Sequence, residues 1–206
     1  MTQGPAARRA TLPFRRICVF AGSSSGADPS HRAAARALGA ALAGRGIELV
    51  YGGARIGVMG ATAAGALEAG GRVIGVIPEA LMLKEVVHDG LTELHITDGM
   101  HGRKAKMAEL SDAFIAAPGG IGTLEELFEI WTWTQLGAHA KPCGLLNVSG
   151  FYDPLLAFLE HVVDAGFLRR EHYDLLSVAE TPTALLDAFA ERPERRVAEW
   201  IGLGET

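Results

Sequence analysis

The sequence lacks the features that mark secreted, membrane-bound and redox proteins. Only two of the 206 residues are cysteines, Cys18 and Cys143. Each falls inside a predicted strand and the two share no metal-ligand spacing, so we expect buried, reduced thiols without a catalytic role. The first residues lack the apolar stretch of a secretory signal, and no segment reaches about 18 uninterrupted apolar residues. These absences favour a cytoplasmic protein without a membrane span.

Basic residues are scarce outside the N-terminus. The chain has 19 Lys and Arg against 24 Asp and Glu, a formal net charge of −5. Four arginines stand among the first sixteen residues, which contain no acid, so the remainder carries 15 basic and 24 acidic residues, or −9. An acidic body of this kind argues against a nucleic-acid partner.

The length and composition fit one α/β domain. Residues 1–13 are small, polar or basic and contain two prolines, which predicts a disordered leader. Residues 14–206 are expected to form a single domain, because 49% of the chain is hydrophobic and its length can bury a full core.

Predicted strands and helices alternate along the chain. The expected strands are 17–21, 47–51, 72–77, 92–96, 112–117, 143–147 and 175–178. The expected helices are 29–43, 58–69, 100–110, one opening at Thr123, 152–165 and 182–190, and a loop with a helical turn is expected at 79–90. Such alternation is typical of a Rossmann-like, doubly wound parallel sheet with helices on both faces.

The most informative segment is the turn from Pro118 to Thr123, with the sequence Pro-Gly-Gly-Ile-Gly-Thr. Glycines let the backbone approach a ligand closely, and the free N–H groups at the start of the following helix attract an anion, most often phosphate. No lysine follows the last glycine and the Gly-x-Gly-x-x-Gly pattern is missing, which argues against triphosphate and dinucleotide loops. We expect a monophosphate site without a metal; a plain tight turn is the alternative.

Three turns of small residues, at Ser23, Gly52 and Gly119, follow predicted strands. In a parallel sheet, ligands bind outside the carboxyl ends of the strands, where the strand order reverses. We therefore expect the three turns to converge at one edge. For the glycines at 52–53 and 57–60, packing between elements is the favoured interpretation.

Two basic residues lie on the helix expected at 100–110. Arg103 shares a helical face with Met100 and Met107, so its guanidinium is directed toward the apolar side. Arginine suits a planar, bidentate hold on phosphate, and Lys104 can add a point charge. An ion pair with a neighbouring acid is the alternative for both residues, and for Lys104 it has equal weight.

Glu126 has two interpretations. Its spacing from Thr123 is that of a capping box with Thr123 as the N-cap, and spacing alone favours capping. Glu126 also shares a second apolar helical face with Ile130 and Trp133. A carboxylate there, one turn from a phosphate site, could stabilise a developing positive charge or orient a water.

Three motifs together resemble the Lonely Guy family of cytokinin riboside 5′-monophosphate phosphoribohydrolases, also labelled lysine-decarboxylase-like. They are Met100-His101-Gly102-Arg103-Lys104, Pro118-Gly119-Gly120-x-Gly122-Thr123-x-x-Glu126 and Thr132-Trp133-x-Gln135-Leu136-Gly137. The resemblance extends from about Ile17 to Ala190. It implies a Rossmann-like fold, a homodimer, no metal and no organic cofactor. It also implies an N-glycosyl hydrolase that splits an N6-modified adenosine 5′-monophosphate into the free base and ribose 5-phosphate.

The resemblance implies roles for the residues that match the motifs. Arg103 and Glu126 would be the catalytic pair, with Glu126 stabilising oxocarbenium character while water attacks the anomeric carbon. Ile130 and Trp133 would line either a prenyl pocket or a dimer contact. The implied substrate-binding residues are Glu85, Lys104, Gly120, Ile121, Gly122, Thr123, Leu124, Glu125 and Thr132.

Departures from the family pattern leave the base preference open. Gly102 stands where a polar or acidic residue is usual, and Leu83 where a proline is common. A general nucleosidase of AMP or other nucleoside monophosphates is therefore one alternative. A non-catalytic carrier of a nucleotide or of molybdenum cofactor is another, which the presence of both Arg103 and Glu126 disfavours. A decarboxylase would need pyridoxal phosphate on a lysine, and none of the four lysines lies in a recognisable cofactor motif.

Overall fold

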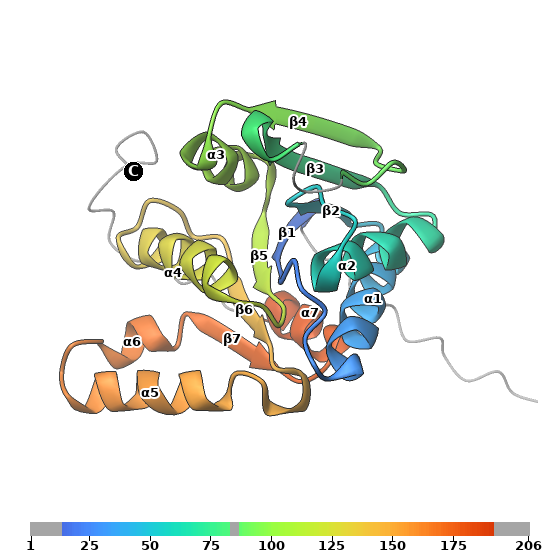
Figure 1. The fold of residues 1–206 in the computed structure, drawn as a ribbon. Helices are drawn as coiled ribbons and strands as arrows, with labels where there is room; N and C mark the ends of the chain where they lie inside the picture. Colours follow the sequence, from blue (N-terminus) through green and yellow to red (C-terminus); the bar gives the residue numbers. More distant parts are fainter. Residues whose placement is uncertain (1–13, 83–86, 192–206) are drawn as a thin grey trace, which may run out of the picture.

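Seven parallel strands form one sheet in the order β4-β3-β2-β1-β5-β6-β7 (Figure 1). The computed structural model describes residues 14–82 and 87–191, so the predicted leader lies outside the described residues. All seven predicted strands are present, and each end lies within one residue of its predicted position. The strands are β1 (Arg16–Phe20), β2 (Glu48–Tyr51), β3 (Val73–Pro78), β4 (Glu93–Thr97), β5 (Ala113–Ala116), β6 (Cys143–Leu146) and β7 (Leu176–Ala179). The predicted doubly wound fold is confirmed.

Helices cover both faces of the sheet (Figure 1). One layer contains α1 (Pro29–Gly44), α2 (Gly57–Glu68) and α7 (Pro182–Glu191). The other contains α3 (Met100–Leu110), α4 (Ile121–Gln135) and α5 (Asp153–Asp164). Short helices η1 (Glu79–Leu81), η2 (Val148–Gly150) and α6 (Arg170–Tyr173) lie in connections; we did not predict α6, because four residues are too few to show helical periodicity. Within the described residues, no helix combines the length and the apolar character needed to cross a membrane.

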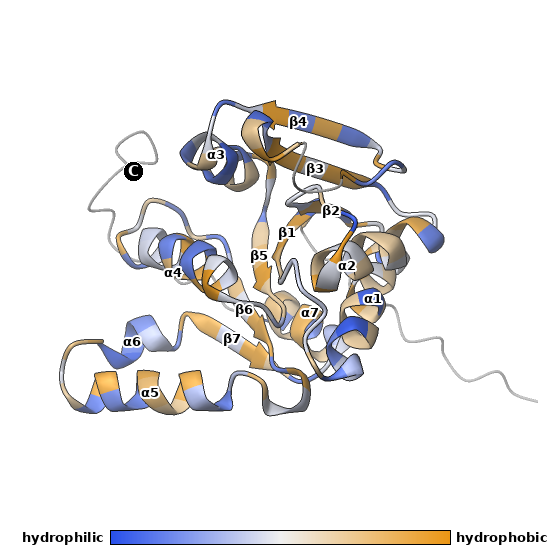
Figure 2. Cartoon of the chain, viewed as in Figure 1, coloured by the Kyte–Doolittle hydropathy of each residue, from blue (hydrophilic) through white to orange (hydrophobic). Residues whose placement is uncertain are grey.

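The central strands are apolar on both faces, as Figure 2 shows, because both faces are covered by helices. In β1, Ile17 and Val19 pack toward the α1–α2 layer, whereas Cys18 and Phe20 pack toward the α3–α4 layer. Both cysteines are buried thiols, as predicted, and they are not joined in a disulfide.

The strand order reverses between β1 and β5, because β2 pairs with one edge of β1 and β5 with the other. The turns that follow these two strands are joined by a hydrogen bond in which the Gly22 amide donates to the Pro118 carbonyl at 3.1 Å. The predicted convergence of the Ser23 and Gly119 turns is therefore confirmed. Such a reversal is the usual ligand-binding position of an open α/β sheet.

Candidate active site

Arg103 lies on α3 and is buried against the carboxyl end of β2. The residue is only 4% exposed, and its Nη2 donates to the Gly52 carbonyl oxygen at 3.2 Å. A Cβ atom at Gly52 would lie 2.1 Å from the same nitrogen, so any side chain there would displace the guanidinium. The predicted burial of Arg103 is confirmed. Gly52, which we interpreted as a packing glycine, also makes room for this charged group.

Glu126 and Arg103 both act electrostatically on Cys18, which lies on β1 beneath α3 and α4. Burial raises the pKa of the Cys18 thiol well above its usual value; the Glu126 carboxylate raises it further and the Arg103 guanidinium opposes this. Opposite charges from two helices therefore face one buried strand.

The start of α4 corrects the prediction of a capping box. The helix begins at Ile121 with Gly120 as its N-cap, and no side chain forms a capping hydrogen bond. Thr123 is thus the third residue of the helix and lies buried against Gly119, where an added Cβ would approach its Oγ1 to 2.1 Å. Glu126 falls in the second turn, too far along to cap the helix. The capping interpretation of Glu126 is wrong, because tight packing of Gly119 on Thr123 moves the helix start upstream.

The turn before α4 borders a cavity of about 210 Å³ at the reversal of strand order. Its walls include the Ser23–Ser24 turn, Pro118 to Gly120 and His31 of α1. The N–H groups of the first turn of α4 have no partner within the helix, and they carry the positive end of its dipole. Gly120, Ile121 and Gly122 are all exposed, so a ligand can reach this backbone. The arrangement can hold a phosphate group.

Lys104 forms ion pairs with two carboxylates of α4. Its Nζ lies 2.5 Å from Glu125 Oε1 and 2.9 Å from Glu129 Oε1, and the residue is only 7% exposed. Burial alone would lower the pKa of Lys104, but the two carboxylates outweigh burial and raise it. The ion-pair alternative for Lys104 is therefore confirmed. The two carboxylates of α4 already balance the charge of Lys104. Through these ion pairs, Lys104 links α3, which carries Arg103, to α4, which carries Glu126.

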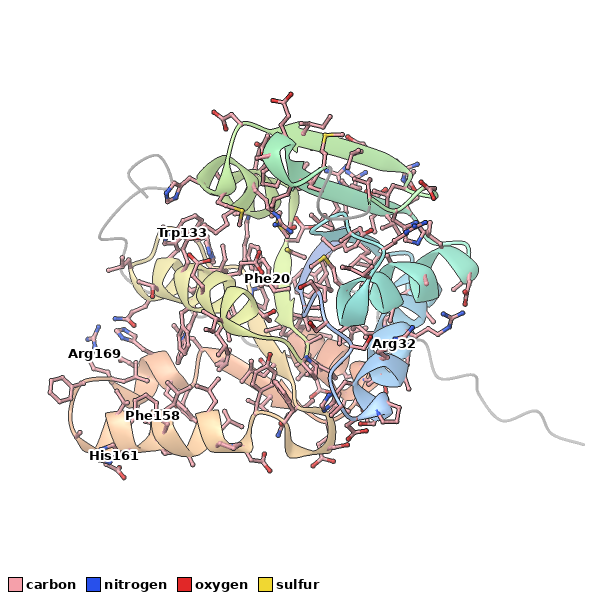
Figure 3. All side chains as sticks on the ribbon, in the orientation of Figure 1. Phe20, Arg32, Trp133, Phe158, His161 and Arg169 are labelled. Carbon is pink, nitrogen blue, oxygen red and sulfur yellow. The ribbon has the colours of Figure 1, made fainter. Side chains whose placement is uncertain are left out.

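A groove of about 490 Å³ lies between α3 and α4. Its lining includes His101, Ala105, Ala108, Glu129 and Trp133. Figure 3 labels Trp133 on α4, on the side toward α3. This side chain is partly buried, whereas Ile130 is 2% exposed and belongs to the core.

The remaining predicted substrate-binding residues differ in exposure. Leu124 is partly buried, whereas Glu125 and Thr132 are exposed on α4. Glu85 lies outside the described residues. Sequence reasoning missed Glu129, although its spacing of four residues from Glu125 places both carboxylates on one helix face and could have predicted a shared cation.

Comparisons with known proteins give matches over most of the chain. A family model described as "Possible lysine decarboxylase" matches residues 59–189. A cytokinin riboside 5′-monophosphate phosphoribohydrolase of Oryza sativa subsp. japonica is 51% identical over 84% of this chain and 72% of its own. One of Arabidopsis thaliana is 48% identical over 86% of this chain and 83% of its own.

Solved structures share the fold at lower identity. The molybdenum cofactor binding protein of Rippkaea orientalis superposes with a TM-score of 0.64 at 27% identity, covering 84% of this chain and 93% of that one. The sequence matches to the plant enzymes are stronger and extend over most of their length. This chain belongs to the Lonely Guy family, the family of the cytokinin riboside 5′-monophosphate phosphoribohydrolases.

Proposed function

We propose that this protein hydrolyses the N-glycosidic bond of cytokinin riboside 5′-monophosphates, which are N6-modified adenosine 5′-monophosphates. The products are the free base and ribose 5-phosphate. The observation that carries the proposal is that Arg103 on α3 and Glu126 on α4 both act on Cys18 of β1, whose following turn is hydrogen-bonded to the phosphate-type turn before α4. The names of relatives about 50% identical to this chain support the same reaction.

The proposed chemistry needs a held phosphate and one carboxylate. The first-turn amides of α4 would bind the 5′-phosphate, which places the ribose beside the second turn of the same helix. As the bond between C1′ and the base nitrogen breaks, positive charge builds on the sugar and the Glu126 carboxylate stabilises it. Water attacks C1′, its hydroxyl remains on the sugar, and the base leaves with a proton. Arg103 would fix the nucleotide in this position.

Further substrate contacts follow from the family resemblance. Lys104, the backbone from Gly120 to Glu125, and Thr132 would meet the phosphate and ribose, and Glu85 would complete the nucleotide site. Lys104 is ion-paired with both Glu125 and Glu129. We expect it to keep at least one of these ion pairs when it contacts the substrate. No metal and no organic cofactor has a part in this scheme.

We also infer a cytoplasmic homodimer. The groove beside Trp133 is open in the single chain, and either a second copy or the N6 substituent of the base could cover it. Since Ile130 lies in the core, Trp133 is the member of the predicted apolar pair that remains available for this contact.

A cofactor carrier is the second candidate, because the superposed molybdenum cofactor binding protein has this fold. The presence of both Arg103 and Glu126 disfavours it, since a carrier has no need of a carboxylate beside the ribose. A general AMP nucleosidase would share every phosphate-side residue and differ only around the base.

Product analysis tests the proposal. The purified protein is incubated in parallel with isopentenyladenosine monophosphate, AMP and the dephosphorylated prenylated riboside. We expect base release from the prenylated monophosphate and none from the riboside, and the AMP reaction reports base specificity. Absence of release from all three would contradict hydrolysis and favour the carrier.

A further inference from the structure

Tyr152 connects the loop after β6 to the turn that precedes α4. Its hydroxyl donates to the Ala117 carbonyl oxygen at 2.8 Å, and the residue is only 2% exposed. Ala117 stands directly before Pro118, and its amide donates to the Phe20 carbonyl at the end of β1. The entry to the phosphate turn is therefore held on one side by β1 and on the other by Tyr152.

The backbone of Tyr152 is itself fixed. Its amide donates to Asn147 Oδ1 at 2.7 Å, and Asn147 Nδ2 donates to Asp153 Oδ1 at 2.7 Å. Asn147 is buried at the end of β6, and its own amide donates to the Ala179 carbonyl of β7. The position of the Tyr152 hydroxyl is thus set by β6 and β7, the two strands that follow β5 in the sheet.

Within the described residues, no backbone amide donates to the Ala117 carbonyl oxygen, so the Tyr152 hydroxyl supplies its donor. Ala117 lies one residue beyond the end of β5, and a buried carbonyl without a donor is costly. The Tyr152 hydroxyl is protonated at neutral pH, as any tyrosine hydroxyl is, and burial raises its pKa further. Without it, the Ala117 carbonyl would have to turn toward another donor, and the adjoining residues Pro118 and Gly119 would move with it.

We propose that Tyr152 is a positioning residue that fixes the phosphate turn through the Ala117 carbonyl. This inference rests on the proposed function, because it takes the ligand of the turn to be the 5′-phosphate of a nucleotide. Tyr152 touches no reacting atom. Its loss is expected to weaken binding of phosphate-bearing ligands while the chemical step proceeds at nearly the same rate.

Tyr51 provides a matched control. It also lies at the end of a strand, β2, and it is fully buried. Its hydroxyl has no hydrogen-bond partner among the described residues. Tyr51→Phe therefore removes the same atom from a similar position without removing a hydrogen bond.

Wild type, Tyr152→Phe and Tyr51→Phe are compared by AMP titration and by hydrogen exchange, with kcat determined alongside. For Tyr152→Phe, calorimetric titration with AMP is expected to show about fivefold weaker binding, the loss of one hydrogen bond, with kcat nearly unchanged. Hydrogen exchange of the amides at 118–124 is expected to become several times faster in this variant and to stay unchanged in Tyr51→Phe.

The two measurements separate the inference from the proposed function. Unchanged exchange at the turn in Tyr152→Phe would overturn the positioning role whatever the activity. Faster exchange across the whole chain, with a lowered melting temperature, would also overturn it and assign a general structural role. If wild type binds no AMP, the proposed function fails, and faster exchange confined to the turn still supports the positioning role.

Discussion

The two helical layers of this protein bury different chemistry. In the α1–α2 layer the helices lie so close that a Cβ at Gly39 would come within 2.0 Å of the Thr62 carbonyl, and α2 buries eight residues, none of them charged. The α3–α4 layer instead buries Arg103 and Lys104. Burying charge costs free energy unless the charge is paired or used. We therefore expect changes in the α1–α2 layer to affect mainly stability, and changes in the α3–α4 layer to affect mainly activity.

The largest effect is expected from the buried cation of the α3–α4 layer. Arg103→Met keeps much of the apolar volume but removes the guanidinium that we propose fixes the nucleotide. We expect kcat/KM for the prenylated monophosphate to fall about 10³-fold, with weaker AMP binding. Arg36→Met, which removes an exposed ion pair with Glu68, serves as the control and should retain activity. Equal losses of kcat/KM in Arg103→Met and Arg36→Met would contradict the assignment of activity to the α3–α4 layer.

The next effect is expected in the α1–α2 layer. Gly39→Ala forces a methyl group into the backbone of α2, so the free energy of unfolding in urea should fall by about 2–3 kcal/mol. The folded fraction should keep its kcat. Gly44→Ala, at the open end of α1, meets no neighbouring atom and should be neutral or slightly stabilising. A catalytic defect in Gly39→Ala without a loss of stability would contradict this assignment.

A half-buried histidine, His139, is expected to make the α3–α4 layer sensitive to acid. Burial, together with the charge of Lys141, lowers the pKa of His139 to about 4. The unfolded chain takes up this proton below about pH 6.5 and the folded chain does not, so stability is lost as the pH falls from about 6.5 to 4. At pH 5 the loss should reach up to about 2 kcal/mol. The difference in unfolding free energy between pH 7 and pH 5, measured in urea, should be smaller in His139→Gln than in wild type. An equal difference in the two proteins would contradict the role assigned to His139.

The smallest effect is expected where the two layers meet, at Gly52. Gly52→Ala places a methyl group against the Arg103 guanidinium, which is a flexible group and can move. We expect about a tenfold rise in KM, with less than about 1 kcal/mol lost in unfolding free energy. Gly44→Ala, which also meets no atom within 4 Å and lies in the other helical layer, should leave KM unchanged. If Gly52→Ala lost more unfolding free energy than Gly39→Ala, the main role of Gly52 would be packing.

Local patterns predicted the elements well. The bounds of α3, Met100–Leu110, were predicted without error, because apolar spacing and a following strand define them. The burial of Arg103 followed from the helix face that it shares with Met107. These features depend on neighbours within one helix, which the sequence displays directly.

Features that depend on contacts between elements could not be predicted in the same way. The start of α4 follows from packing of Thr123 on Gly119 and not from the capping pattern that Thr123 and Glu126 display. The pairing of Lys104 with Glu129 requires the relative placement of α3 and α4, which no single helix encodes. The same holds for the hydrogen bond from Tyr152 to Ala117, which joins residues 35 positions apart.

The most direct test of the central claim is Glu126→Gln, which keeps the shape of the side chain and removes its charge. Turnover of the prenylated monophosphate, AMP affinity and melting temperature are measured on one preparation, with Glu68→Gln on the exposed side of α2 as the control. We expect kcat to fall about 10³-fold in Glu126→Gln, with AMP affinity and melting temperature at wild-type values. Retained turnover would contradict a catalytic Glu126, and a lowered melting temperature with retained turnover would assign the carboxylate to the stability of α4.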